Sequence, residues 1–159
     1  MGIRDRCQVK SEVVIRPIAR EDWRRWKVLW EEYLRFYRET VPDATTRLTF
    51  DRLCNNVDGM FGYVATSGND ITGLVHALIH PSTWSSSCYC YLEDLFVTPA
   101  ARGSDVARAL IEVVAEEAAI RSAERVYWHT QEFNGPARSL YDQVARRTSF
   151  VVYERLSSQ

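Results

Sequence analysis

The sequence predicts an α/β fold in which one mixed sheet carries helices, and two observations lead to this prediction. Strand-like and helix-like stretches alternate along the 159 residues, with three strands in succession near the middle. Runs of antiparallel strands with helices interposed are typical of an α/β sheet with mixed strand directions. The composition also shows no break: there is no internal repeat or low-complexity linker, and hydrophobic residues make up 46% of the chain. That share is ordinary for one globular core, so we expect a single domain over residues 1–159.

The first third of the chain predicts one strand and two helices. Val13–Ile18 is strand-like and ends in a turn. Glu21 and Asp22 then open a helix, because acidic side chains favour the positive end of the helix dipole. Aromatic side chains recur along this helix at helical spacing: Trp23, Trp26, Trp30, Tyr33 and Tyr37. Such stripes are usually packed into a core, so we expect most of these rings to be buried. A loop from Pro42 and a short second helix, Leu48–Cys54, complete this part.

The remainder predicts a hairpin followed by alternating strands and helices. The turn 67–70, Ser-Gly-Asn-Asp, joins the strands Phe61–Thr66 and Ile71–His80, because such residues tolerate the unusual backbone angles of turns. His76 and His80 fall on one face of the hairpin. A buried structural histidine explains each better than a catalytic or metal-binding role, because no third ligand is visible. The later elements are expected at Cys88–Val97 (strand), Ser104–Ser122 (helix), Arg125–Thr130 (strand), Gly135–Val144 (helix) and Phe150–Arg155 (strand).

Charge and cysteine usage argue against several classes of function. The formal net charge is −1, so nothing favours a general affinity for nucleic acid or for an anionic membrane surface. No apolar run is long enough to cross a membrane, and the polar start of the chain lacks the apolar core of a signal peptide. The absence of a C-x-x-C pair argues against a zinc or thioredoxin-like site and favours reduced thiols. We therefore expect a cytoplasmic protein with no bound metal. The four cysteines are Cys7, Cys54, Cys88 and Cys90.

The stretch 91–109 combines a strand, a tight turn and a helix start. The strand carries two adjacent carboxylates, Glu93 and Asp94, and ends at a proline. The free N–H groups and the positive dipole end of a helix start favour an anion. Gly103 lets the backbone approach a ligand, and Arg102 can add a charge-assisted hydrogen bond to a phosphate. The stretch therefore predicts a phosphate-bearing ligand lying across a strand that also carries acid–base groups.

Two motifs in this chain resemble those of the GCN5-related N-acetyltransferases (GNAT). The turn 102–107, Arg-Gly-Ser-Asp-Val-Ala, is similar to the family's pyrophosphate loop, Arg/Gln-x-x-Gly-x-Gly/Ala, except that Asp105 replaces the central glycine. Segment 134–141, Asn-Gly-Pro-Ala-Arg-Ser-Leu-Tyr, matches the family's Asn-x-x-Ala-x-x-x-Tyr motif. The run 91–97 looks most like the spermidine/spermine and thialysine acetyltransferases, and also like the yeast-type histone and D-amino-acid acetyltransferases.

The resemblance implies a fold, a co-substrate and an activity. The fold is a mixed, mostly antiparallel sheet of six to seven strands with helices on both faces, whose central parallel strands splay apart to admit coenzyme A. Acetyl-CoA would be the co-substrate, with no metal, and the protein would be a homodimer, as is common in the resembling families. The acetyl group would pass to a primary amine of a small cationic molecule or lysine-like group, by direct attack in a ternary complex. The alternative is a module that binds acyl-CoA without turnover. Asp105 is the feature of the sequence that most favours this alternative.

The resemblance also assigns roles to single residues. Glu93 is the expected base or water-organising group, and Tyr141 would be the general acid that protonates the leaving thiolate. Asn134 and Ala137 would contact the arm of the coenzyme. Backbone N–H groups for the thioester and the pantetheine amides are expected on Leu95, Phe96 and Val97. The pyrophosphate would lie on Arg102, Gly103, Ser104, Asp105, Val106, Ala107 and Arg108. Substrate binding is expected at Glu31, Tyr33, Trp84 and Glu93.

Two acidic residues have separate expectations. Asp94 is expected on the opposite face of the strand from Glu93, as a hydrogen-bonded structural carboxylate, because neighbouring strand residues alternate. Asp105 would repel a pyrophosphate. We expect Ser104 to cap the helix and Asp105 to lie in its first turn, where the dipole favours a negative charge. Flanking arginines would offset part of the repulsion, so coenzyme binding is expected to survive, somewhat weakened.

Overall fold

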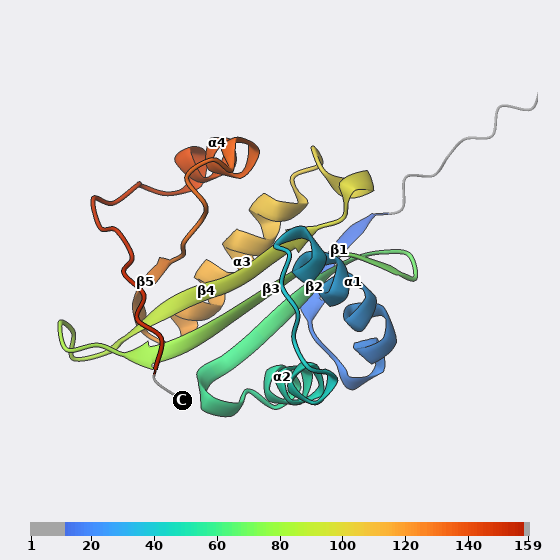
Figure 1. Cartoon of the computed structure of the whole chain (residues 1–159), viewed down its shortest axis with the longest axis horizontal. Coiled ribbons are helices and arrows are strands. Elements are labelled where there is room, and N and C mark those ends of the chain that lie inside the picture. Colours follow the sequence, from blue (N-terminus) through green and yellow to red (C-terminus); the bar gives the residue numbers. More distant parts are fainter. Residues whose placement is uncertain (1–11, 158–159) are drawn as a thin grey trace, which may run out of the picture. The chain divides into compact units, whose positions relative to one another are not determined.

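The computed structural model describes residues 12–157 and contains one five-stranded sheet (Figure 1). The strands follow chain order across the sheet. Neighbouring strands are antiparallel up to β4, whereas β4 and β5 are parallel. The mixed, mostly antiparallel sheet is therefore confirmed, with five strands instead of six or seven. The strands are β1 Val13–Pro17, β2 Met60–Ser67, β3 Asp70–Pro81, β4 Cys88–Val97 and β5 Ala123–Tyr127.

Helices cover both faces of this sheet: α1 and α2 lie on one face and α3 on the other (Figure 1). Adjacent residues of β3 show this, because they point to opposite sides. Leu74 belongs to a core shared with Trp26 of α1. A side chain at Gly73 would instead come within 3.0 Å of Leu110 of α3, so this glycine allows α3 to pack closely. The helices are α1 Trp23–Phe36, α2 Asp43–Asn55 and α3 Val106–Ile120.

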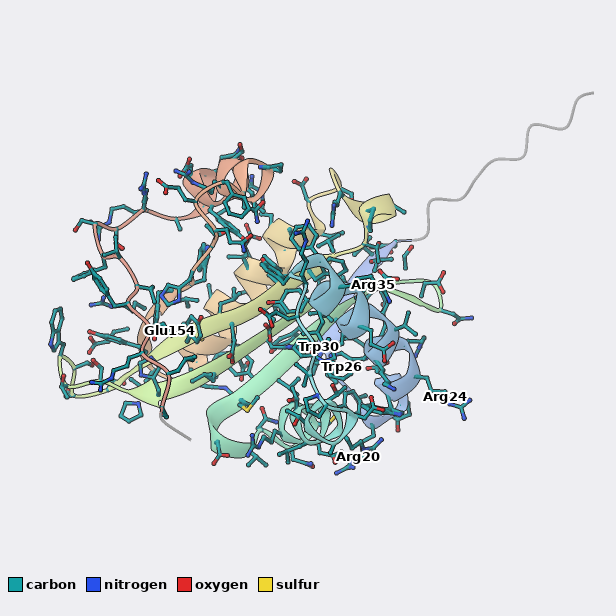
Figure 2. The ribbon with its side chains drawn as sticks, viewed as in Figure 1. Arg20, Arg24, Trp26, Trp30, Arg35 and Glu154 are labelled. Carbon is teal, nitrogen blue, oxygen red and sulfur yellow. The ribbon has the colours of Figure 1, made fainter. Side chains whose placement is uncertain are left out.

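The aromatic stripe of α1 is packed into the core, as predicted. Trp26 is fully buried, Trp30 is 7% exposed, and their rings stack with centres 5.6 Å apart. Figure 2 shows both tryptophans on the inner side of α1 and Arg24 on its outer side. The second helix begins at Asp43, five residues earlier than predicted. Its first turns include Thr46, which is buried and accepts a hydrogen bond from the Trp30 indole at 3.3 Å, so tertiary contact extends this helix beyond its apolar residues.

Residues from Thr130 onward form a second compact unit after the one that ends at His129. The predicted helix is confirmed as α4, Gly135–Val144. The predicted closing strand 150–155 is wrong, because this segment has no regular structure. Aromatic and β-branched residues such as these form a strand only where a neighbouring strand supplies hydrogen bonds, and none of the described strands pairs with this segment. A single domain over 1–159 stays a prediction. The large apolar side chains Phe150, Val151, Val152 and Tyr153 are exposed.

A buried carboxylate ties the first strand to the start of α1. Asp22 is 1% exposed and accepts two hydrogen bonds from the Arg16 guanidinium, at 2.7 and 2.8 Å. The backbone N–H of Ala19 donates to it at 2.9 Å, and Arg25 lies 3.2 Å away. The hydrogen bonds from Arg16, more than any other contact, hold the pKa of Asp22 below its ordinary value despite burial. This pair therefore stabilises the fold only while Asp22 is ionised.

We expect Asp22→Asn to lower the free energy of unfolding by about 2 kcal/mol at neutral pH, because it leaves a partly buried Arg16 without its charge partner. Since the folded pKa of Asp22 lies below the ordinary value of about 4, the difference is complete above about pH 4 and disappears as the pH falls through the folded pKa. Urea unfolding of both proteins at neutral pH and near pH 3 measures this. The control is Asp51→Asn, which breaks an exposed pair with Arg47 and should cost about 0.5 kcal/mol or less. Equal losses in the two variants would contradict the prediction.

Candidate active site

β4 carries a β-bulge at Glu93. Asp94 lies opposite His76 of β3, and the next pair toward the start of β4 joins Leu92 to Ala77. Glu93 lies between these pairs as an extra residue without a partner of its own. Bulges interrupt the alternation of side chains, re-aim them and occur often beside active sites. The alternation rule therefore does not assign Glu93 to a face at this point, and the opposite placement of Asp94 and Glu93 stays a prediction.

β4 and β5 separate just before this bulge. Their parallel pairs end at Tyr91 and Tyr127, whereas β4 continues to Val97. Over residues 92–97 the edge of β4 that faces away from β3 is therefore not paired with β5. Alternate strand residues direct their N–H groups to opposite edges, so the predicted thioester-binding stretch 95–97 offers N–H groups on this edge. This is the splay that the family resemblance implied.

Glu93 is the acidic side chain nearest in sequence to that separation. Its side chain is exposed, yet enough protein surrounds the carboxyl group to desolvate it in part. This desolvation raises the pKa of Glu93, and the negative charge of Asp94 raises it further. A positive charge on His76 would act in the opposite direction. A carboxylate with a raised pKa is a better proton acceptor, which suits a general base.

Asp94 belongs to a hydrogen-bonded chain of buried and half-buried side chains. Tyr33 donates its hydroxyl to Oδ1 of Asp94 at 2.7 Å, and Nδ1 of His76 lies 2.9 Å from Oδ2. The indole N–H of Trp26 donates to Nε2 of His76 at 3.0 Å. The interpretations of His76 as a satisfied buried histidine and of Asp94 as a hydrogen-bonded carboxylate are confirmed. Sequence reasoning missed that one chain of contacts joins them, because no local pattern connects residues 18 to 61 positions apart.

The residues expected to bind substrate lie in different places. Tyr33 reaches the bulge through its hydrogen bond, and burial, followed by the neighbouring carboxylate, raises the pKa of its phenol. Glu31 is exposed and pairs at 3.3 Å with a lysine one turn earlier. Trp84 is 74% exposed in the loop before Cys88. Cys88 and Glu93 are five residues apart on β4, which is a distance of roughly 16 Å along the strand. The structure thus brings Tyr33, and not Trp84, to the bulge, and substrate binding by each stays a prediction.

The turn between β4 and α3 has an exposed glycine at its centre. Gly103 has a φ of +80°, which other residues rarely adopt, and apart from its chain neighbours no described atom lies within 4 Å of where its Cβ would be. Its backbone is therefore open to a ligand. Arg102 donates from Nε to the Val97 carbonyl at 3.3 Å, and its guanidinium lies 5.8 Å from the ring centres of Phe36 and Phe96. These contacts hold a cation at the turn, as an anion site requires.

Asp105 directly precedes α3, which begins at Val106. The expectation that Ser104 caps the helix is wrong, because Ser104 comes one residue before the capping position and its hydroxyl donates to the Ala101 carbonyl. The Asp105 side chain is 97% exposed, and its carboxylate lies 3.8 Å from the Arg108 guanidinium. The charge of Asp105 is therefore largely solvated and partly balanced by Arg108. Asp105 itself lies before the first turn of α3 and not in it.

The second motif forms the start of α4, in the second unit. Asn134 directly precedes the helix, and Ala137 and Tyr141 follow it by three and seven residues. Residues at this spacing lie along one side of a helix. The three side chains therefore form one row, and their roles stay predictions.

A search of residues 12–157 for other reactive groups gives few candidates. It finds no group of three or more His, Cys, Asp or Glu side chains able to hold a metal ion. Over the same residues, every helix is too short or too polar to cross a membrane. Cys54, Cys88 and Cys90 are free thiols, and Cys7 lies outside the described residues.

Comparisons with known proteins agree with this geometry. The acetyltransferase (GNAT) family model matches residues 26–145. The D-amino-acid N-acetyltransferase HPA3 of Saccharomyces cerevisiae is 34% identical over 149 residues, which cover 92% of each chain. The thialysine N-epsilon-acetyltransferase of Caenorhabditis elegans is 30% identical over 98 residues, 60% of this chain and 61% of the relative. Among solved structures, the fold resembles aminoglycoside N-acetyltransferase AAC(6')-Iy in complex with CoA, with a TM-score of 0.81, 20% identity, and 93% and 97% of the two chains covered.

We expect Asp105→Gly to bind coenzyme A roughly two- to tenfold more tightly, because it removes one solvent-screened negative charge from an anion site. Calorimetry at low and high salt measures this, and the gain should shrink at high salt. Asp43→Gly is the matched control, because it removes an exposed carboxylate from the start of a different helix. Weaker binding by Asp105→Gly would show that Asp105 helps to form the site, for example by ordering Arg108.

Proposed function

The chain belongs to the acetyltransferase (GNAT) family, and from this premise we propose that it moves an acetyl group to a primary amine of a small cationic molecule or lysine-like group. It is an N-acetyltransferase with acetyl-CoA as co-substrate, so the alternative of a non-catalytic acyl-CoA-binding module is not retained. One observation carries the proposal: Glu93, a carboxylate of raised pKa, lies at a bulge where β4 and β5 separate.

The proposed reaction is direct attack of the amine on the thioester in a ternary complex. The amine must be neutral to attack, and Glu93 accepts its proton directly or through water. As the C–N bond forms, N–H groups on the unpaired edge of β4 stabilise the oxyanion. The C–S bond then breaks, and Tyr141 gives its proton to the leaving thiolate. Phenols and thiols have pKa values within about two units of each other, so this transfer is nearly balanced.

The proposed place of the coenzyme follows from the turn and the helix start. The pyrophosphate would lie against Gly103 and the first N–H groups of α3, with Arg102 as a charged donor. Asn134 and Ala137 are proposed to contact the pantetheine arm. The open backbone at Gly103 and the contacts that hold Arg102 at the turn support this arrangement.

The proposed acceptor class rests on local charge and on the relatives. Glu93 and Asp94 are adjacent carboxylates, and Glu31 and Glu32 add negative charge on α1. A carboxylate-rich site favours a cationic substrate. HPA3 is named for D-amino acids and the nematode relative for thialysine, which are both small amines. A cytoplasmic location stays a prediction.

Removing the proposed general acid should slow turnover without loss of coenzyme binding. We expect Tyr141→Phe to lower kcat by roughly 10²-fold or more, because the thiolate must then leave without a proton. Acetyl-CoA affinity should stay nearly unchanged. Thiol release over a range of pH with a good amine substrate measures kcat. Tyr153→Phe, at a 91% exposed tyrosine of the same unit, is the control. Wild-type kcat in Tyr141→Phe would remove Tyr141 from the mechanism.

The proposed base makes a separate prediction about acceptors. Accepted substrates should be cationic amines, and Glu93→Gln should raise KM, lower kcat/KM by roughly 10–10²-fold and shift the pH optimum upward, because the amine must then lose its proton to water. A panel of polyamines, lysine analogues, D-amino acids and aminoglycosides, assayed by thiol release, tests this. Glu112→Gln on the exposed face of α3 is the matched control. A preference for neutral or anionic acceptors, together with a wild-type profile in Glu93→Gln, would refute the proposal.

We also propose a homodimer. The segment 150–153 exposes four consecutive large apolar side chains, and contiguous apolar surface of this kind often marks an interface. Light scattering at micromolar concentration should give about twice the monomer mass of 18.4 kDa. Val152→Glu should shift the protein toward monomer, whereas Val28→Glu at an exposed valine of α1 should not. A wild-type mass of one chain would contradict the dimer.

A further inference from the structure

Four side chains from three elements form one chain of hydrogen bonds beside Glu93. It runs from Trp26 of α1 through His76 of β3 to Asp94 of β4, and it returns to α1 at Tyr33. The three links measure 3.0, 2.9 and 2.7 Å. Trp26 is fully buried and His76 is 2% exposed, so little water competes for these bonds. Figure 2 shows Trp26 on the side of α1 that faces the sheet.

The chemistry of the donors fixes the direction of every link. An indole N–H can only donate, so Nε2 of His76 must accept from Trp26. Nε2 then carries no proton, and the proton of the neutral imidazole lies on Nδ1, which donates to Asp94. The hydroxyl of Tyr33 donates to the other oxygen. Asp94 thus receives hydrogen bonds from two neutral groups, and none of the other three side chains of the chain is a cationic partner for it.

We propose that this chain keeps the charge of Asp94 uncompensated beside Glu93, and so makes Glu93 a stronger base. Trp26 fixes the tautomer of His76 in this chain, because its N–H donates to Nε2. Asp94 is therefore a positioning residue that acts through Glu93 and need not touch the amine. The inference rests on the proposed role of Glu93 as the base.

The groups that face Glu93 are consistent with this role. From its own strand, Asp94 repels a negative charge on Glu93, while Tyr91 is a phenol whose pKa is raised by burial and by Glu93. From β3, only a charged His76 would offset that repulsion. From α1, Tyr33 is a half-buried phenol whose pKa is raised by burial and by Asp94, so it stays neutral. The imidazole of His76 is thus the one group of this set that could carry a positive charge beside Asp94, and its Nε2 is occupied as the acceptor for Trp26.

The first test removes the charge and keeps the size of the side chain, although the amide retains only one of the two acceptor oxygens. In Asp94→Asn, the midpoint of the Glu93 carboxyl titration, followed by carbon NMR of glutamate-labelled protein, should fall by roughly 0.5–1 pH unit. The Glu93 signal is assigned with Glu93→Gln. The kcat/KM at neutral pH should fall, while KM for acetyl-CoA should stay near that of the wild type. A Glu93 midpoint that does not move would overturn the inference.

The second test replaces the indole of Trp26 by a smaller phenyl ring that has no N–H, and it does not depend on Asp94→Asn folding. Nitrogen NMR of histidine-labelled wild-type protein should show His76 protonated on Nδ1 and not on Nε2 at neutral pH. Trp26→Phe should allow a proton on Nε2 as well, and should reduce kcat/KM where that proton is present. Trp30→Phe is the matched control for loss of an indole, because the Trp30 ring also packs with its centre 5.4 Å from that of the imidazole but its N–H is bonded to Thr46. The imidazole signal can move in this variant, but Nδ1 should remain the protonated nitrogen. A wild-type His76 protonated on Nε2 would overturn the inference.

These measurements separate failure of the inference from failure of the proposed function. Both NMR titrations report on the protein whether or not an amine is acetylated. If acetylation proceeds but the midpoint of the Glu93 titration is the same in Asp94→Asn as in the wild type, the inference fails and the proposed function stands. If Glu93 responds as expected but Glu93→Gln acetylates amines with the wild-type pH profile, its role as base fails, and with it the catalytic meaning of the chain.

Discussion

The rest of the site depends on one extra residue in β4. Without the bulge at Glu93, the odd spacing of Tyr91 and Asp94 would place them on opposite faces of the sheet. With it, Asp94 pairs with His76 and lies on the face that α1 covers, and Tyr91, paired with Leu78, shares that face. A bulge also bends its strand and increases the local twist. The same short stretch therefore contains the candidate base, its charged neighbour and the point at which β4 and β5 part.

The helix opposite this bulge combines packing with polar contact. Trp26 and Tyr33 are seven residues apart on α1, so they lie on one side of it. Each ring buries apolar surface, and each carries one polar group into the core: Trp26 supplies the donor for Nε2 of His76, and Tyr33 supplies the donor for Oδ1 of Asp94. A phenylalanine at either position would leave that acceptor atom unsatisfied, which is costly in a low-dielectric interior. The aromatic stripe is thus part of the site as well as part of the core.

Local rules predicted most of the elements, whereas contacts between distant residues decided the site. Periodicity found α1, α3, α4, the hairpin and β4, and turn chemistry placed Gly103 at an open backbone. The bulge could not be predicted, because an extra residue is defined by the register of a partner strand. The predicted cap, Ser104, was one residue away from the observed capping position, Asp105. The hydrogen bonds that set a helix start can be predicted from sequence only to within a residue or two. Segment 150–155 has the composition of a strand but lacks a described neighbour to pair with.

The edge of β4 beyond Tyr91 has a consequence for the protein without its coenzyme. Backbone groups on an unpaired strand edge are a template on which another extended chain can add. An occupant that satisfied those groups would protect the native state by mass action, since it binds the folded chain and not the unfolded one. The solubility and shelf life of the purified protein would then depend on how much of it carries coenzyme A, and the preparation stripped of coenzyme would be the one prone to aggregate.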